Sequence, residues 1–123
     1  MAAPNLLSPT TITGKTVTVN LTTTSATSVL SNAASSGKAL KINSLYVANT
    51  TASAANITIN QYSAAALGGT AVPIASTIAV PGNATLVVID KDAYVYLEEN
   101  TSLGATAGTS SALQIVCSYE DIS

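Results

Sequence analysis

The chain has 123 residues, a net charge of −2 and only 8% charged residues, and it contains neither histidine nor arginine. The length fits one domain, and so neutral a chain lacks the cationic surface on which nucleic-acid binding depends. Without histidine and arginine it lacks the usual general base, the commonest metal ligand and the bidentate phosphate clamp. We therefore expect no enzyme: no catalytic residues, no cofactor and no metal site.

Residues 1–9 contain two prolines and no hydrophobic periodicity, which predicts an extended N-terminal arm ahead of one domain over residues 10–123. The arm has no signal-peptide pattern, and no stretch of the chain approaches the roughly 20 apolar residues of a membrane helix. We expect synthesis in a cytoplasm and no membrane partner. The arm either lies along its own domain or reaches a neighbour. Its candidate interface residues are Pro4, Asn5, Leu6 and Leu7.

The first strand is predicted over residues 11–21, because Val17, Val19 and Leu21 alternate with polar residues. A weaker strand follows at 24–30 and a turn at 31–37. Residues 39–48 form a stronger strand whose apolar face changes after Ile42. Either both faces of this strand are covered, or a bulge near Asn43 and Ser44 redirects it.

The second half of the chain continues with short strands and frequent turn residues. Residues 63–70 are compatible with one helical turn that Gly68 and Gly69 end, and Pro81-Gly82 suits the centre of a type II turn. Some eight to ten short strands at this spacing predict an all-β antiparallel sandwich, of jelly-roll or immunoglobulin-like type. The further strands are expected at 56–62, 74–80, 86–89, 94–97, 102–107 and 112–119.

An acidic group between residues 90 and 99 is the best candidate for chemistry. Paired carboxylates can carry out acid–base catalysis, bind calcium or make an interface contact. Acidic residues that flank turns are more commonly solvated, which is the interpretation that we favour. The group consists of Asp90, Asp92, Glu98 and Glu99.

Three other side chains have two interpretations each. Cys117 alternates with apolar residues, which favours a buried structural thiol over a reactive one. Tyr94 and Tyr96 share a strand face. They either fill a core that lacks Phe and Trp, which is favoured, or form a binding platform for sugar or peptide.

The scarcity of charge bears on assembly, since a neutral surface gives a free monomer little protection against association. We favour a surface covered by neighbouring subunits, and the alternative is that Ser and Thr hydroxyls solvate it. The sequence of residues 77–103, followed by LQIVCSYEDI, resembles small virion structural proteins of tailed bacteriophages, especially marine and cyanobacterial ones. Residues 1–16 and 38–62 are similar to the same group.

This resemblance implies a capsid decoration or cement protein, made in the host cytoplasm and located in the virion. Its implied partners are the major capsid protein or other virion subunits and further copies of itself, with a trimer favoured. A receptor- or glycan-binding component of the tail, neck or fibre is the alternative. Related chains carry a glycine–aspartate turn where Glu98-Glu99-Asn100 stands here. Because Asn tolerates a left-handed backbone, we expect the turn to persist.

Overall fold

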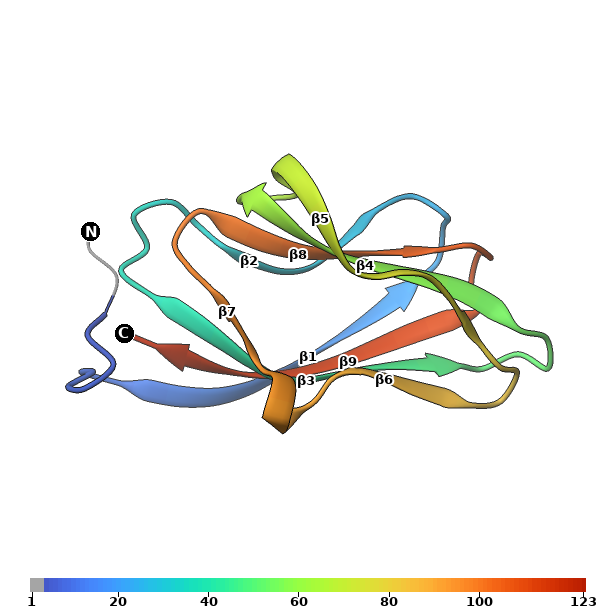
Figure 1. The fold of residues 1–123 in the computed structure, drawn as a ribbon, viewed down its shortest axis with the longest axis horizontal. Helices are drawn as coiled ribbons and strands as arrows, with labels where there is room; N and C mark the ends of the chain where they lie inside the picture. Colours follow the sequence, from blue (N-terminus) through green and yellow to red (C-terminus); the bar gives the residue numbers. More distant parts are fainter. Residues whose placement is uncertain (1–3) are drawn as a thin grey trace.

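The computed structural model describes residues 4–123, and two antiparallel sheets packed face to face make up most of this part of the chain (Figure 1). One sheet has the strand order β1-β9-β3-β6, with β7 also paired to β3, and the other has the order β2-β8-β4-β5. The elements are β1 (Ile12–Leu21), β2 (Thr27–Asn32), β3 (Ala39–Asn49), β4 (Ala55–Ala64), β5 (Gly68–Val80), β6 (Thr85–Ile89), the 3₁₀ turn η1 (Lys91–Ala93), β7 (Val95–Leu97), β8 (Thr101–Ala107) and β9 (Leu113–Ile122).

The predicted antiparallel sandwich is confirmed, and its connectivity is that of a jelly roll. Successive strands pass from one sheet to the other, apart from the β4–β5 hairpin and the β6–β7 step. This arrangement interleaves strands from both ends of the sequence, so β9 lies between β1 and β3. No helix within residues 4–123 is long and apolar enough to cross a membrane.

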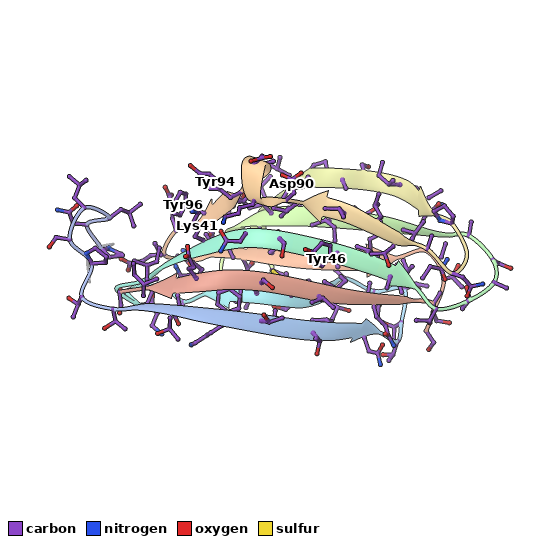
Figure 2. The ribbon with its side chains drawn as sticks, turned by 90° about the horizontal axis from the view of Figure 1, so that it is seen from below. Lys41, Tyr46, Asp90, Tyr94 and Tyr96 are labelled. Atoms are coloured by element: carbon purple, nitrogen blue, oxygen red, sulfur yellow. The ribbon has the colours of Figure 1, made fainter. Side chains whose placement is uncertain are left out.

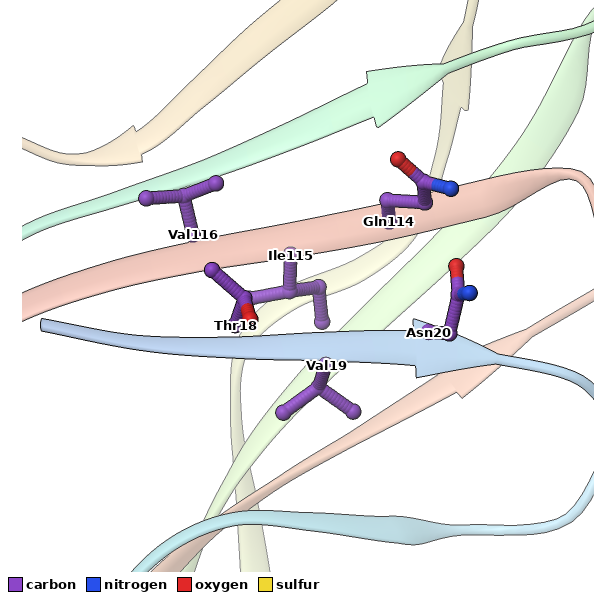
Figure 3. A pocket seen from close by; sticks show the side chains of 6 residues that line it. All are labelled: Thr18, Val19, Asn20, Gln114, Ile115 and Val116. Carbon is purple, nitrogen blue, oxygen red and sulfur yellow. The ribbon is translucent and has the colours of Figure 1, made fainter.

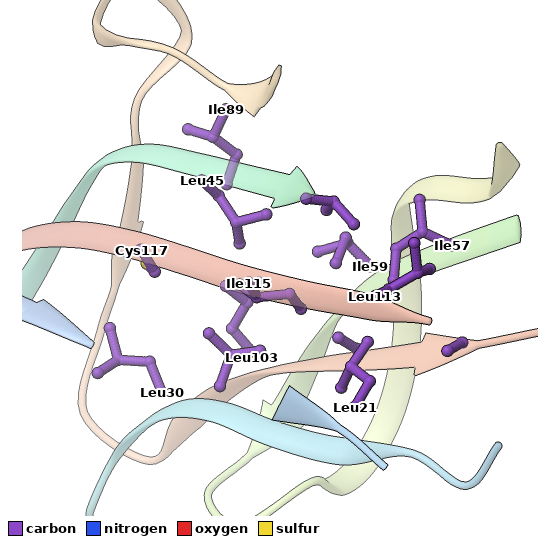
Figure 4. Packing of buried hydrophobic residues seen from close by; sticks show 14 of the residues in the cluster. Leu21, Leu30, Leu45, Ile57, Ile59, Ile89, Leu103, Leu113, Ile115 and Cys117 are labelled. Atoms are coloured by element: carbon purple, nitrogen blue, oxygen red, sulfur yellow. The ribbon is translucent and has the colours of Figure 1, made fainter. Parts of the chain in front are cut away.

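The core lies between the two sheets and is built from aliphatic side chains of both inner faces (Figure 4). Branched side chains stiffen these strands and fill the space between the sheets. The fully buried large side chains are Leu21, Ile42, Leu45, Val47, Ile57, Ile59, Val80, Ile89, Leu97, Leu103, Leu113 and Ile115.

The change of apolar face along β3 is caused by a bulge, which was one of the two predicted alternatives. The register between β3 and β9 shifts between Ile42 and Ser44, at the position predicted. The extra residue returns Leu45 and Val47 to the face of Leu40 and Ile42, and all four are buried.

The predicted turn at Pro81-Gly82 exists, but with different central residues. At Pro81–Ala84 the N–H of Ala84 donates to the carbonyl of Pro81, so Gly82 and Asn83 are the central residues. The positive φ is at Asn83 rather than Gly82, and asparagine is one of the residues that tolerate that conformation. The Glu98–Thr101 turn does persist with Asn100 left-handed, as expected.

The predicted helical turn at 63–70 is instead a tight hairpin turn between β4 and β5. Ala66 and Leu67 both have positive φ, and the N–H of Gly68 donates to the carbonyl of Ala65. This is the mirror-image turn that matches the twist of paired strands. Oxygens of three other side chains accept its N–H groups at 2.9–3.1 Å: Asn100, Ser31 and Ser102.

We expect Gly82→Ala to destabilise the fold by about 1–3 kcal/mol, the usual cost of overpacking. A Cβ atom at this position would collide with the backbone carbonyl of Ala52, which cannot swing aside as a side chain can. The measurement is the free energy of unfolding in guanidinium chloride.

Gly14→Ala is the matched control, since nothing lies within 4 Å of the Cβ position there. It should leave stability unchanged or raise it by up to about 1 kcal/mol. Equal losses in the two variants would contradict the proposed clash.

Candidate functional site

The charged side chains are segregated to one part of the sandwich. They lie at the start of β1, around the start of β3, on η1 and beside it, in the β7–β8 turn and at the end of β9. These segments occupy the half of the molecule that holds both termini (Figure 1). The residues are Lys15, Lys38, Lys41, Asp90, Lys91, Asp92, Glu98, Glu99, Glu120 and Asp121.

The opposite end of the sandwich has four loops and no charged side chain. We call these loops the neutral end: residues 22–26, 50–54, 81–84 and 108–112, with sequences TTTSA, TTASA, PGNA and GTSSA. Hydrogen bonds tie three of these loops, 50–54, 81–84 and 108–112, to one another. The N–H of Thr50 donates to the carbonyl of Ala112 at 3.0 Å, and that of Asn83 to Thr51 at 2.8 Å. The neutral end is therefore an uncharged and well-braced surface.

A buried asparagine braces the neutral end from beneath. The side-chain amide of Asn49 donates to the carbonyls of Ser53 and Val80, at 2.8 and 3.0 Å, and its oxygen accepts the N–H of Thr51. Asn49 is 3% exposed, so these bonds satisfy a group that would be costly to bury alone. They fix the β3–β4 loop against the end of β5.

The half of the sandwich that carries the charged side chains is called the charged end. There, one carboxylate forms ion pairs with two lysines. Asp121 accepts bonds from Lys15 Nζ at 2.9 Å and from Lys38 Nζ at 3.2 Å. Burial raises the pKa of Asp121, but the hydrogen bonds from the two lysines outweigh burial and hold that pKa below its ordinary value. The hydrogen bond to Asp121 raises the pKa of Lys15 in turn. This cluster clamps β1, β9 and the segment before β3 together.

Tyr94 and Tyr96 do not fill the core, so the favoured interpretation of these residues is wrong. Aliphatic side chains already fill the space between the sheets, and both rings lie on the outer surface beside β3 (Figure 2). The rings meet edge to face, with centroids 5.6 Å apart. Lys41 Nζ lies 4.5 Å from the centroid of the Tyr94 ring. Tyr94 is 48% exposed, so a small cation–aromatic cluster faces solvent.

The acidic group does not form a shared site. Asp90 caps η1, where its side chain accepts the N–H groups of Asp92 and Ala93 at 3.0 Å each. Asp92 and Glu98 are exposed, in agreement with the solvated-turn interpretation. Among the residues that the structure describes, no three Cys, Asp or Glu side chains gather closely enough to hold a metal ion.

Cys117 is fully buried on the inner face of β9. Burial raises the pKa of its thiol to about 12. The interpretation as a structural thiol is confirmed.

The candidate interface residues of the arm lie beside the C-terminus. The N–H of Leu7 donates to the side chain of Asn5 at 3.0 Å, so residues 5–8 form a turn rather than an extended segment. Leu6 is half exposed and Leu7 is 95% exposed. Pro4, Asn5 and the C-terminal Ser123 line a shallow hollow. Residues 1–3 lie outside the described part, and the role of the arm as an interface stays a prediction.

No protein-family model matches the chain, and no curated protein matches it. Among solved structures it is similar to a chain from Bacillus endospore appendages, which are described as a novel family of disulfide-linked pili. The two are 18% identical, with a TM-score of 0.52 over 92% of this chain and 88% of that one. At this identity the similarity shows the shared sandwich fold.

The segregation of charge was missed by sequence reasoning, although the charge positions are visible in the sequence. Only the strand order shows that residues 15, 38 and 121 meet, and that four uncharged loops share one end. Long uncharged stretches, such as residues 42–89, were the available signal.

We expect the Cys117 thiol to resist Ellman's reagent in the folded protein at about pH 8, because it is both buried and protonated. In concentrated guanidinium chloride the same thiol should react at once. Rapid labelling without denaturant would contradict this burial.

We expect the Asp121 cluster to make stability fall in acid. The pKa of Asp121 is lower in the folded than in the unfolded chain. Its contribution is therefore complete above about pH 5 and is lost as the pH falls through the unfolded and then the folded pKa. The difference in unfolding free energy between wild type and Asp121→Asn should shrink as the pH falls from neutral into that range.

Asp92→Asn is the control, since Asp92 is exposed on η1. If the difference in unfolding free energy between wild type and Asp121→Asn stays constant with pH, the role of this carboxylate is refuted.

Proposed function

We propose that this chain is a non-enzymatic structural subunit that acts as one of many copies in a larger assembly. The observation that carries the proposal is the neutral end, an uncharged surface braced by hydrogen bonds. Such a surface meets a neighbour without separating ions from water and without repulsion between like charges. Because its loops are already ordered, docking costs little conformational entropy. The charged end then keeps the assembled subunit hydrated.

The similarity to a pilus chain supports the same class of function. The appendages of that neighbour are described as disulfide-linked. A disulfide between copies of this chain would have to use its one cysteine, and Cys117 is buried in the core. The buried cysteine argues against disulfide links between copies, and we infer that assembly uses non-covalent contacts, many of which together provide avidity.

Within this class, the resemblance to phage virion proteins favours a capsid decoration or cement protein. The neutral end would contact the shell, and the exposed Leu7 of the arm would contact a neighbouring subunit. The localisation would be the virion, and the partner the major capsid protein. These assignments depend on the sequence resemblance.

A tail or fibre adhesin is the second candidate, favoured by the exposed cluster of Tyr94, Tyr96 and Lys41. Exposed tyrosines are enriched at binding interfaces, because the ring is apolar and the hydroxyl is polar. Here Lys41 lies over one face of the Tyr94 ring, which reduces the area left for stacking.

The deciding experiment is quantitative mass spectrometry of purified phage particles that encode the chain. A decoration protein should be present in numbers comparable to the major capsid protein. A small number of copies would support the adhesin. Absence of the chain from particles would overturn the assignment to a virion.

The neutral end is tested by Ser110→Glu, which adds one charge to the exposed loop before β9. We expect this variant to lose at least tenfold in affinity for particles that lack the native chain, because docking would desolvate the new carboxylate. Ala34→Glu, in an exposed turn at the charged end, is the matched control and should bind like wild type. Wild-type affinity in both variants would show that the neutral end is not the contact surface.

A further inference from the structure

Strand β1 leaves a long and regular edge open. It is the terminal strand of its sheet, and all ten of its residues pair with β9 without a register shift. Figure 2 shows β1 along one margin of the sheet with no strand beyond it. An edge of this kind presents unpaired N–H and C=O groups to another chain.

The hydrogen-bond pattern shows which groups are open. Thr11 and Ser123 exchange both of their backbone bonds, at 3.0 and 2.9 Å. Because the antiparallel pattern repeats every second residue, the odd-numbered residues of β1 bond to β9 and the even-numbered ones point away. We call the latter the open-edge residues: Ile12, Gly14, Thr16, Thr18 and Asn20. Their backbone groups are uncommitted, apart from the Asn20 carbonyl, which accepts the N–H of Thr22.

The other edge strands are short or interrupted. β5 contains Pro73 and three register shifts relative to β4, and β2 has six residues and one shift. β6 and β7 have five and three residues. Proline, bulges and short length are the devices by which proteins protect sheet edges from pairing. β1 has none of them, so a second β1 is the partner strand that matches it in length and regularity.

The charge of the edge is also compatible with a second copy. The cation of β1, Lys15, is already bonded to Asp121. On the outer face the open-edge residues are neutral, and Thr18 and Asn20 stand beside Gln114 and Val116 around a shallow hollow (Figure 3). Two such edges can therefore pair without placing like charges opposite each other, and threonine pairs across strands are favourable.

We propose that two copies of this chain pair antiparallel through β1, about a two-fold axis at Thr16. In this register Thr16 faces its own copy, Gly14 faces Thr18, and Ile12 faces Asn20, so every open-edge residue bonds to another. The uncommitted groups of these pairs supply about eight hydrogen bonds, within the range found in a typical protein interface. The two sheets become one continuous sheet across the dimer. This proposal rests on the assembly function proposed above and names one of its contacts.

A two-fold contact of this kind is isologous and closes at two copies. It therefore predicts a dimer of the isolated chain, rather than the trimer that three-fold positions on a shell would favour. A trimer or an open polymer formed through β1 would place a different strand opposite it and would overturn the proposal.

Amide hydrogen exchange by NMR tests the pairing in the unmodified protein. The odd-numbered amides from Thr13 to Val19 should be protected at every concentration, because they bond to β9. The amides of Gly14, Thr16 and Thr18 should gain at least tenfold protection only as the chain is concentrated from low micromolar to near-millimolar. Fast exchange of these three amides at all concentrations would overturn the proposal.

Thr16→Pro tests it by mutation. The N–H of Thr16 points to the open edge, so proline removes a donor from the proposed interface and none from the β1–β9 ladder. Sedimentation equilibrium should give twice the 12.3 kDa chain mass for wild type and a single chain mass for Thr16→Pro. Thr16→Ala retains the N–H and should remain a dimer.

Correct folding of Thr16→Pro is verified by the resistance of Cys117 to Ellman's reagent, and Thr18→Pro serves as a second variant if the first is unfolded. A folded proline variant that still dimerises would overturn the pairing through β1. The copy number of the chain in particles is measured separately, so the assembly function can stand when this interface fails.

Discussion

The interleaving of aliphatic side chains between two sheets is the interaction on which every other feature depends. Leu103 on β8 and Ile115 on β9 face each other across the sandwich, and both are fully buried. Without Phe or Trp, the core relies on many medium-sized side chains whose shapes must fit closely. The bulge in β3 exists for this reason, since it keeps Leu45 and Val47 directed inward after Ile42. The core also determines which groups remain at the two ends and along the edges.

Much of the sandwich could be predicted from alternation alone. The strand ending at Leu21 and the strand carrying Leu113 and Ile115 have clear inner and outer faces, because each has one face in water. The bulge near Ser44 could be named as an alternative but not chosen, since covered faces and a bulge produce the same pattern. The turn predictions are wrong where Asn83, Ala66 and Leu67 adopt left-handed conformations more typical of glycine.

The candidate surfaces were harder to predict, because they depend on which strands are neighbours. Lys15 and Asp121 are 106 positions apart in sequence, yet their side chains are in contact. The lack of Phe and Trp favours a core position for Tyr94, whereas its ring lies on the outer surface beside Lys41. A fold of this kind serves many functions, so the proposals here depend on surface chemistry and on the sequence resemblance.

The hairpin turn between β4 and β5 has a consequence for how the chain reaches this fold. Ala66 and Leu67 occupy a conformation that costs a non-glycine residue about 1–2 kcal/mol each. The oxygens that hold the turn come from Ser31, Ser102 and Asn100, on or beside β2 and β8. The turn therefore gains its supporting bonds only when distant segments have already docked. This hairpin should close late in folding rather than nucleate it, so its register is set by the finished sheet instead of by its own residues.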